Sequence, residues 1–246
     1  MIAPLPDDES ARLRSLCQYQ ILDTEPEVGF DDLTNLAASI CHTPITFVSL
    51  VDAQRQWFKA KVGTDVAETP RDVAFCSHAI LQLDLLIVPD TLADERFATN
   101  PLVVGEPHIR FYAGVPLIMP DGHALGTLCV IDFIPRALTP NQLEALQALG
   151  RQVVAQLELR RQLLEADHLT RELQHNEAAL RESEARFRIM TDSAPVLIWI
   201  DDPDQQCVFH NQTYLSFTGR SLKNLGMVGR NVCIQTIDRI GRIAML

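Results

Sequence analysis

Apolar positions in the first part of the chain change between helical and strand-like spacing. In residues 30–41 the apolar side chains fall on one stripe, which predicts an amphipathic helix. Residues 45–51 are apolar and β-branched with little polar alternation, which is typical of a central strand. The same reasoning predicts helices at residues 7–19 and 75–83 and strands at residues 55–62, 86–88, 111–119 and 124–132.

Local signals refine these strands. Asp121-Gly122 separates the last two, and this pair between apolar runs predicts a hairpin with a type I′ turn. Pro116 lies inside the preceding strand, which indicates an edge position or a bulge because proline has no amide proton. Residues 91–109 show no clear periodicity, which is typical of a lid or binding loop.

A long stretch from Arg151 to Ala194 contains neither glycine nor proline. One apolar position recurs there every seven residues, at Leu159, Ala166, Leu173, Leu180 and Phe187. This spacing predicts a helix that pairs with a second copy, so we expect a homodimer. The neighbouring seam carries polar and acidic residues, which predicts loose pairing. Thr139 and Pro140 suit the N-cap and the first helical position.

After this helix the pattern predicts strands at residues 196–200 and 207–209 and a short helix at residues 211–217, ended by Gly219. Strand and helix do not alternate strictly, which disfavours a doubly wound nucleotide-binding sheet. The expected fold class is α/β in the α+β sense. It has a mostly antiparallel sheet flanked by helices, then a long connecting helix, then a smaller and incomplete unit.

The charge balance restricts the partners. The chain has 32 acidic residues against 21 basic ones and a formal net charge of -11. We therefore expect no nucleic acid and no membrane as partner, since phosphate groups need basic surfaces. No apolar run reaches the ~18 residues of a spanning helix, and the N-terminus is acidic where a signal peptide is basic. We expect a soluble, cytoplasmic protein.

The six cysteines are scattered along the chain and form no CxxC pair. This spacing does not support a four-cysteine zinc site. It indicates reduced thiols that pack as small apolar side chains. The sequence predicts no metal site, and it leaves any cofactor unknown.

Several segments resemble known families. The first part contains ILDTEPEVGFDDLTNLAASIC, PITFVSLVDAQRQWFKAKVG, TPRDVAFCSHAI, VPDTLADERFATNPLV and IRFYAGVPL…DGHALGTLCVID. Over residues 18–160 these segments resemble a bacterial GAF domain, of the subgroup at the front of sensor histidine kinases and diguanylate cyclases. The later segment SEARFRIMTDSAPVLIWIDDPDQQCVFHNQTYLSFTGRS resembles the opening of a PAS domain.

The resemblance implies a domain order. Residues 1–138 would form a GAF sensor domain, residues 139–187 a connecting signalling helix, and residues 188–225 a partial PAS domain. Residues 226–246 depart from the PAS pattern, so we expect a disordered tail outside the family on a truncated chain. The implied function is the sensory input module of a bacterial signal-transduction protein of the two-component histidine kinase type. Such a module binds a small molecule or partner in the GAF pocket and relays its state through the helix.

Seven residues are candidates for binding a ligand in the implied pocket: Trp57, Lys59, Arg71, Cys76, His78, Arg110 and Tyr112. Side chains alternate along a strand, so either Trp57 and Lys59 face the pocket or Phe58 does. Arg71 either clamps an anionic group or anchors its loop through an ion pair. Arg110 and Tyr112 share a strand face and either close over a ligand or pack on each other.

The segment Phe75-Cys76-Ser77-His78 offers the most chemistry. Cys76 and His78 are a candidate haem or redox site, or else a packing thiol and a hydrogen-bonded histidine. Phytochrome-like GAF domains attach a bilin to a cysteine directly followed by histidine, whereas Ser77 intervenes here. The alternative function is a GAF-fold redox enzyme resembling free methionine sulfoxide reductases, with Cys76 or Cys129 as nucleophile.

His168 and His175 lie on the predicted long helix. The run up to His175 resembles the approach to a phosphoacceptor histidine, but the basic continuation and an ATP-binding segment do not follow in this sequence. We therefore expect surface histidines, no catalytic residue and no enzyme activity of the chain as it stands.

Overall fold

The structure is a computed structural model that describes residues 2–203 and 207–219. The chain divides into two compact units, residues 1–166 and 167–246. The helices of the first unit are α1 (Glu9–Gln18), α2 (Val28–Cys41), α3 (Cys76–Ala79) and α4 (Pro101–Val104), with a short 3-10 helix η1 (Arg71–Val73). Its strands are β1 (Ile45–Val51), β2 (Arg55–Val62), β3 (Glu68–Pro70), β4 (Leu86–Val88), β5 (Phe111–Ile118) and β6 (Ala124–Asp132). Helix α5 (Pro140–Ser193) begins in the first unit and continues into the second.

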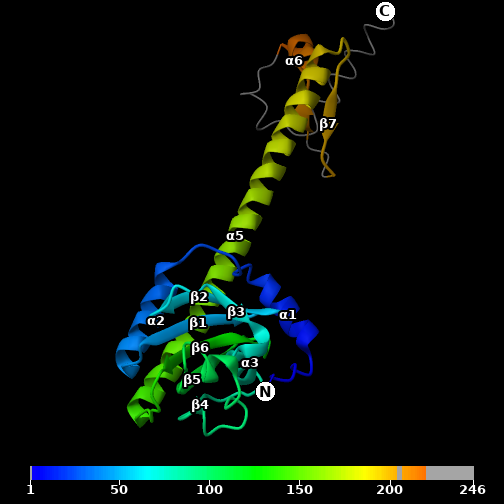
Figure 1. Ribbon diagram of the computed structural model, residues 1–246. Helices are drawn as coiled ribbons and strands as arrows, with labels where there is room; N and C mark the ends of the chain where they lie inside the picture. Colours follow the sequence, from blue (N-terminus) through cyan, green and yellow to red (C-terminus); the bar gives the residue numbers. More distant parts are fainter. Residues whose placement is uncertain (1, 204–206, 220–246) are drawn as a thin grey trace, which may run out of the picture. The chain divides into compact units, whose positions relative to one another are not determined.

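One six-stranded sheet forms the centre of the first unit, in the order β3-β2-β1-β6-β5-β4. All its strand pairs are antiparallel, as the expected fold class requires. Helices α1 and α2 and the beginning of α5 cover one face, whereas α3 and the segment around α4 cover the other (Figure 1). β1 lies between β2 and β6 and is buried along its whole length, which explains why its sequence shows little polar alternation.

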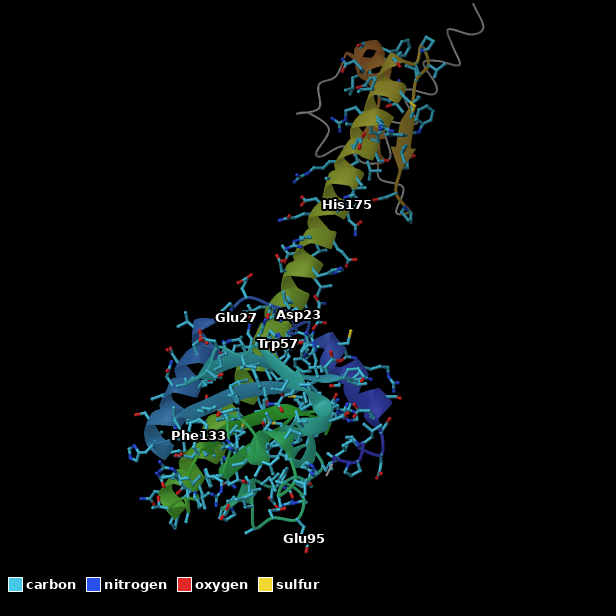
Figure 2. All side chains as sticks on the ribbon, viewed as in Figure 1. Asp23, Glu27, Trp57, Glu95, Phe133 and His175 are labelled. Carbon is cyan, nitrogen blue, oxygen red and sulfur yellow. The ribbon has the colours of Figure 1, made fainter. Side chains whose placement is uncertain are left out.

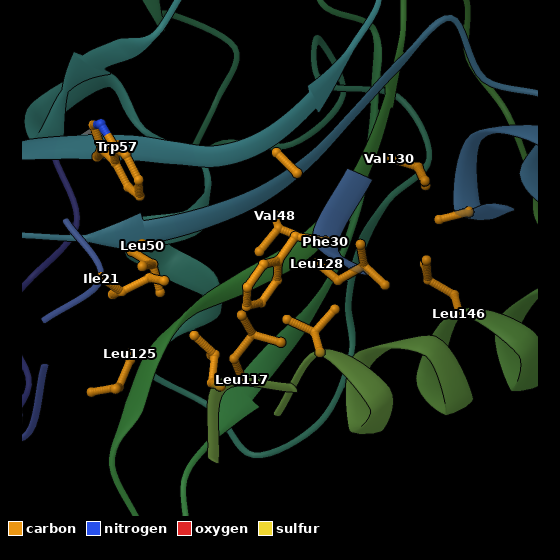
Figure 3. Packing of buried hydrophobic residues seen from close by; sticks show 14 of the residues in the cluster. Ile21, Phe30, Val48, Leu50, Trp57, Leu117, Leu125, Leu128, Val130 and Leu146 are labelled. Atoms are coloured by element: carbon orange, nitrogen blue, oxygen red, sulfur yellow. The ribbon is translucent and has the colours of Figure 1, made fainter. Parts of the chain in front are cut away.

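The face under α2 and α5 holds the larger apolar core (Figure 3). Phe30 of α2 is fully buried in one cluster with Val48 of β1, Leu128 of β6 and Leu146 of α5. Burying a side chain of this size contributes roughly 1.5–3 kcal/mol. Because α5 supplies part of this core, the first compact unit extends to residue 166 and not to the expected end at residue 138.

The strand predictions at residues 45–51, 55–62, 86–88 and 124–132 agree with the observed bounds. The sequence pattern does not predict β3 or α4. β3 is a three-residue edge strand, and α4 has four residues inside the segment without periodicity. Elements this short contain too few side chains to establish a period.

The hairpin between β5 and β6 forms at Asp121-Gly122, but the expected turn type is wrong. Gly122 has a φ of +88° and donates its N–H to Met119 O at 2.9 Å, whereas Asp121 does not have a positive φ. A type I′ turn needs a positive φ at both central residues. Pro120 occupies the second position of the observed turn, where its fixed φ suits a type I turn.

Pro116 coincides with a bulge, because the register of the β5–β6 pair shifts between Pro116 and Ile118. β5 is not an edge strand, since β4 pairs with its first half. Both interpretations of Pro116 therefore hold locally, because the register shifts beside it and the pairing with β4 ends at Gly114, before Pro116. A bulge interrupts the hydrogen-bond ladder locally, which accommodates a residue without an amide proton.

The start of α5 has the predicted cap. Thr139 Oγ1 accepts a hydrogen bond from Gln142 N at 3.3 Å, and Gln142 Oε1 accepts one from Thr139 N at 2.9 Å. This reciprocal arrangement is a capping box, which satisfies two backbone donors at the helix start. Pro140 at the first position has no donor that needs a partner.

The second unit contains the end of α5, two antiparallel strands and a short helix. The strands are β7 (Trp199–Asp201) and β8 (Cys207–His210), and the helix is α6 (Gln212–Thr218). Gly219 ends α6 in the left-handed conformation with a φ of +69°, as its position in the sequence predicts. The disorder expected for residues 226–246 lies outside the described residues.

Asn211 connects the elements of the second unit. Its Oδ1 accepts hydrogen bonds from Ile198 N and Tyr214 N, both at 3.0 Å. Its Nδ2 donates to Thr191 O at 2.8 Å and to Val196 O at 2.9 Å. One buried amide thus ties the last turn of α5 to the segment before β7 and caps α6.

Within residues 2–203 and 207–219, helices are too short or too polar to cross a membrane.

Candidate functional site

A cavity of about 120 Å³ lies between the sheet and the segments around α3 and α4. Its walls are mostly apolar and include Ile45, Phe47, Phe58, Phe75, Tyr112 and Ile131. Phe47 and Phe58 stack with their ring centroids 4.1 Å apart, which gives the sheet side of the cavity a flat aromatic surface. Exposed Val66 and Pro107 also line the cavity, so it opens to solvent on their side.

A larger hollow of about 340 Å³ lies along β5 and α5. Its polar lining residues, among them Asp84, Gln147 and Arg151, are exposed. It is therefore an open surface groove without a buried polar group that could select a ligand. The smaller cavity is the better candidate for a binding site, since ligand sites combine apolar walls with a few buried polar groups.

One polar side chain lines the smaller cavity from β2. Gln56 is 4% exposed, and its Oε1 has no hydrogen-bond partner among the described residues. A buried carbonyl oxygen without a partner costs about 1–3 kcal/mol. A bound molecule that donates a hydrogen bond to Oε1 would remove this cost. Gln56 therefore offers a ligand in the cavity one buried hydrogen-bond acceptor.

Cys76 lies at the inner end of this site, fully buried at the start of α3. Three hydroxyl groups of the sheet surround its sulfur: Thr127 Oγ1 at 2.9 Å, Ser49 Oγ at 3.2 Å and Tyr112 OH at 3.3 Å. Cys129 Sγ lies 3.8 Å from the same sulfur. The two cysteines are separated by 53 positions in sequence and meet only through the fold.

The pKa values of this cluster move in opposite directions. Burial by itself raises the pKa of Cys76, but hydrogen bonds from Cys129, Ser49, Thr127 and Tyr112 outweigh burial and lower it to about 7. Burial raises the pKa of Cys129, and the neighbouring Cys76 raises it further. Burial likewise raises the pKa of Tyr112, followed by the charges of the two cysteines. Cys76 is thus the more acidic thiol of the pair.

Trp57 and Lys59 do not line the cavity. Trp57 belongs to the larger apolar core on the opposite face of the sheet (Figure 3), and Lys59 is held by partners on that same side. Phe58, between them, lines the cavity. Their selection as pocket residues is therefore corrected, because β2 directs alternate side chains to opposite faces.

Arg71 and Arg110 also lie outside the cavity. Arg71 Nη1 donates to Glu9 Oε1 at 2.5 Å and to Asp52 O at 2.9 Å, so Arg71 anchors its loop. Arg110 pairs with both carboxylate oxygens of Asp90 at 2.9 Å. Both arginines donate hydrogen bonds to acceptors of the protein itself. The interpretation of Arg71 as a clamp for an anionic ligand therefore has no support.

Tyr112 lines the cavity, but it neither closes over it with Arg110 nor packs on that arginine. Its ring stacks on Phe75 with the centroids 5.3 Å apart. His78 is not a cavity residue either, since it packs edge-on against Phe97 with the centroids 4.8 Å apart. Cys76 and His78 therefore do not share a site. A cavity of about 120 Å³ is also too small for haem or bilin.

A charge network joins β2 to α5 within the first unit. Glu27 Oε1 accepts hydrogen bonds from Lys59 Nζ at 2.8 Å and from Arg160 Nε at 2.9 Å. Arg160 Nη1 donates to Tyr19 O at 2.8 Å, and Tyr19 OH donates to Glu158 of α5. Burial raises the pKa of Glu27, but the hydrogen bonds from Lys59 and Arg160 outweigh it and lower the pKa.

Sequence reasoning missed Gln56, Ser49 and Thr127 as site residues. A signal was present for Ser49 and Thr127, because each is a polar residue inside an apolar strand, whereas Gln56 is one of four polar or charged residues of β2 and does not stand out. Buried polar side chains need a partner, so such positions point to a polar cluster or to a ligand. The direction in which each side chain points could not be read from one sequence.

His168 and His175 are exposed on α5, where Figure 2 labels His175. Among residues 2–203 and 207–219, His, Cys, Asp and Glu form no group of three or more that could hold a metal ion.

Two family matches follow the order of the two units. The GAF domain family matches residues 25–157, and the PAS domain family matches residues 185–243. The PAS match includes residues 226–243, which we expected to lie outside that family.

Among known proteins, the chain is similar to a cyclic di-GMP phosphodiesterase of Pseudomonas aeruginosa. The two are 38% identical over 199 residues, which cover 80% of this chain and 33% of that protein. The chain thus spans about a third of the length of this relative.

Solved structures show a similar fold at low sequence identity. The bacteriophytochrome RpBphP3 from R. palustris is 12% identical with a TM-score of 0.50, covering 73% of this chain and 44% of that one. The GAF domain of an Acinetobacter phosphoenolpyruvate-protein phosphotransferase is 19% identical with a TM-score of 0.46, covering 63% and 95%. Since the GAF match takes in more than half of the chain and the antiparallel sheet has the corresponding fold, the chain belongs to the GAF domain family and carries a PAS domain after its GAF domain.

Proposed function

We propose that the chain is the sensory input module of a bacterial signalling protein and binds a small molecule in the cavity of its GAF domain. The observation that carries this proposal is Gln56 Oε1, a buried acceptor without a partner among the described residues, in a mostly apolar cavity of about 120 Å³. An apolar cavity of about 150 Å³ holds benzene. The ligand is therefore about one ring in size, mostly apolar, and carries a hydrogen-bond donor for Gln56.

The route from this cavity to α5 runs through β2. Phe58 lines the cavity, and the next residue, Lys59, points to the other face and binds Glu27. Glu27 in turn binds Arg160 of α5. A ligand that moves Phe58 therefore displaces Lys59, and through two charge-assisted bonds it biases the position of α5. Charge-assisted hydrogen bonds suit this role because they are short and directional.

Gln56→Leu is expected to separate ligand recognition from stability. Phenol carries the hydrogen-bond donor that benzene lacks, so the wild type should bind phenol more tightly. The variant should bind phenol about tenfold more weakly, the equivalent of one net hydrogen bond. Without ligand it should gain about 1 kcal/mol in unfolding free energy, because an unpaired buried acceptor is removed. Isothermal titration calorimetry and urea unfolding measure the two effects.

Benzene serves as the matched control ligand, and its affinity should be equal or higher in Gln56→Leu. Equal binding of phenol to the wild type and to Gln56→Leu would contradict the role of Gln56. If the wild type binds neither phenol nor benzene, the proposal that the cavity is a ligand site is contradicted. The natural ligand can be sought by mass spectrometry of small molecules released from the purified protein.

The proposed assembly is a homodimer through α5. Leu159, Leu173 and Leu180, which recur at heptad spacing, are all at least half exposed in the single chain. A second copy would cover this stripe in a parallel pair. Phe187, the last member of the stripe, also packs against Phe209 of β8 with the ring centroids 5.1 Å apart. Pairing of the helices would therefore act directly on the packing of Phe187 against the PAS unit.

Leu173→Glu with Leu180→Glu is expected to convert the dimer into a monomer. Four carboxylates would face each other along one seam, and like charges at a helix interface destabilise it. Multi-angle light scattering over a range of concentrations measures the change. The control is His175→Glu, which adds a charge on the outer face of the same helix and should leave the dimer intact. A wild type that is monomeric throughout would contradict the assembly.

The output that the module regulates is proposed from its relative. That Pseudomonas aeruginosa protein is named a cyclic di-GMP phosphodiesterase, and this chain corresponds to a third of its length. Cyclic di-GMP turnover is therefore the favoured output, and a two-component histidine kinase is the second candidate. In either case the proposed role of this chain is to bind the ligand, to form the dimer and to transmit the bound state through α5, without catalysis of its own.

A further inference from the structure

Two cysteines meet beside the cavity, although their separation in sequence does not suggest a pair. Cys76 Sγ and Cys129 Sγ lie 3.8 Å apart, and both residues are at most 1% exposed. Both are free thiols. The sulfurs would have to approach each other to about 2.05 Å to form a disulfide.

Access to this pair is through the cavity. Cys76 is one of the lining residues, whereas Cys129 lies behind it in the sheet. A cavity of about 120 Å³ admits a molecule as small as hydrogen peroxide but not a peptide disulfide such as oxidised glutathione. The geometry therefore selects a small oxidant.

The polar groups around the pair give the two sulfurs different roles. Three hydroxyl groups and one thiol can donate to Cys76 Sγ, which stabilises a thiolate there. Thr127 and the backbone of Phe47 also hydrogen-bond to Cys129, but burial and the neighbouring Cys76 outweigh them, raise its pKa and keep it protonated. A thiolate next to a neutral thiol is the arrangement that peroxide oxidation followed by disulfide closure requires.

We propose that Cys76 and Cys129 form an intramolecular disulfide when a small hydroperoxide enters the cavity. The Cys76 thiolate attacks the outer oxygen of the hydroperoxide, the O–O bond breaks, and the leaving oxygen takes a proton to become an alcohol or water. Cys76 is then a sulfenic acid. The Cys129 sulfur attacks it, the S–O bond breaks, and hydroxide leaves with the Cys129 proton as water. Two thiols lose two electrons in total, and the hydroperoxide gains them.

The disulfide would alter the cavity wall. Tyr112 OH donates to Cys76 Sγ at 3.3 Å, and the Tyr112 ring lines the cavity together with Phe75. Closing the sulfur pair draws Cys76 away from this hydroxyl and changes the packing of the aromatic wall. Oxidation and ligand binding therefore act on the same wall of the cavity. The proposal does not depend on a resident ligand, because the cavity serves here only as the entrance.

The test treats the reduced chain of 246 residues with one equivalent of hydrogen peroxide, blocks the remaining thiols and maps the cysteines by mass spectrometry. The expected product is a single linked peptide pair that joins Cys76 to Cys129 within one chain and is reversed by dithiothreitol. Oxidised glutathione should not produce this link in the folded chain. If it does so as fast as hydrogen peroxide, the entry route through the cavity is wrong.

Variants assign the two roles. Cys129→Ala should leave Cys76 as a sulfenic acid that dimedone labels, whereas Cys76→Ala should protect Cys129 from the same peroxide dose. Cys41→Ala, which removes another buried thiol, should form the link at the wild-type rate. Tyr112→Phe keeps both cysteines and should slow the link several-fold, because the thiolate loses one donor.

The proposal is overturned if Cys76 and Cys129 stay reduced while the exposed Cys17 is fully oxidised. It also fails if the link forms only between chains. Gln56→Leu distinguishes this proposal from the proposed ligand function. The variant should bind phenol more weakly and still form the disulfide between Cys76 and Cys129.

Discussion

Gly126→Ala should lower the unfolding free energy of the GAF domain by about 3 kcal/mol or more, at or beyond the upper end for overpacking. Gly126 of β6 pairs with Leu50 of β1 at the centre of the sheet. A Cβ at this position would lie 1.9 Å from Ser49 O and 2.8 Å from Leu50 Cα. Both are backbone atoms, so rotamer changes cannot relieve the contact and the two central strands must separate. Urea unfolding followed by circular dichroism measures the loss.

Gly29→Ala is the matched control for this prediction. A Cβ at Gly29 of α2 would meet only the side chain of Gln156, whose Nε2 lies 2.7 Å away. The far end of a glutamine can rotate aside, and alanine favours a helix over glycine by about 1 kcal/mol. The Gly29 variant should therefore stay within about 1 kcal/mol of the wild type. If both glycines tolerate alanine equally well, the close approach of β1 and β6 is refuted.

Glu27→Gln should destabilise the GAF domain by about 3 kcal/mol, the low end of the cost of breaking a buried ion pair. The side chain of Lys59 is 0% exposed, and Glu27 is its carboxylate partner. Without that carboxylate the ammonium group stays buried with uncharged acceptors alone, namely Thr24 Oγ1, Glu25 O and the introduced amide oxygen. The low end applies because Glu27 itself is 34% exposed. Chemical denaturation at pH 7 measures the difference.

Lys59→Met should cost less than Glu27→Gln, although it affects the same contact. In that variant Glu27 keeps Arg160 as its partner and remains partly solvated, so no buried charge is left alone. A larger loss in Lys59→Met would show that packing, and not the buried charge, decides stability here.

The same pair has a consequence for the pH dependence. The pKa of Glu27 in the folded chain lies below its ordinary value of 4.5, so its contribution is present above that pH and is lost as the pH falls through the folded value. Glu27→Gln lacks this contribution, and its unfolding curve should therefore approach that of the wild type in acid.

Much of the fold could be predicted because the main strands bury a continuous apolar surface. β1, β4 and β6 follow from runs of β-branched and apolar residues, and the start of α5 follows from Thr139 and Pro140. The hairpin turn was predicted with the wrong type. Asp-Gly is shared by several turns, and Pro120, just before it, favours a type I turn.

The candidate site was harder to predict, because it depends on which face each strand residue occupies. Of the seven candidates, Cys76 and Tyr112 line the cavity. Trp57 packs on the far face and His78 packs against Phe97. The three charged candidates form ion pairs within the protein, as Lys59 does with Glu27 and Arg110 with Asp90. The sequence around a charged residue does not show whether its side chain binds a ligand or pairs with another side chain of the protein.

The sequence by itself determined the order of the longer elements, the antiparallel class of the sheet, the long helix and the two families, since periodicity and local motifs are properties of neighbouring residues. It did not predict the short elements β3 and α4. Tertiary structure alone decided that Cys76 contacts Cys129 and that Glu27 binds both Lys59 and Arg160. It also decided that the side-chain oxygen of Gln56 faces the cavity and has no hydrogen-bond partner among the described residues. These contacts join residues far apart in the chain. They exist only after strand register and helix packing have placed the side chains on the same face.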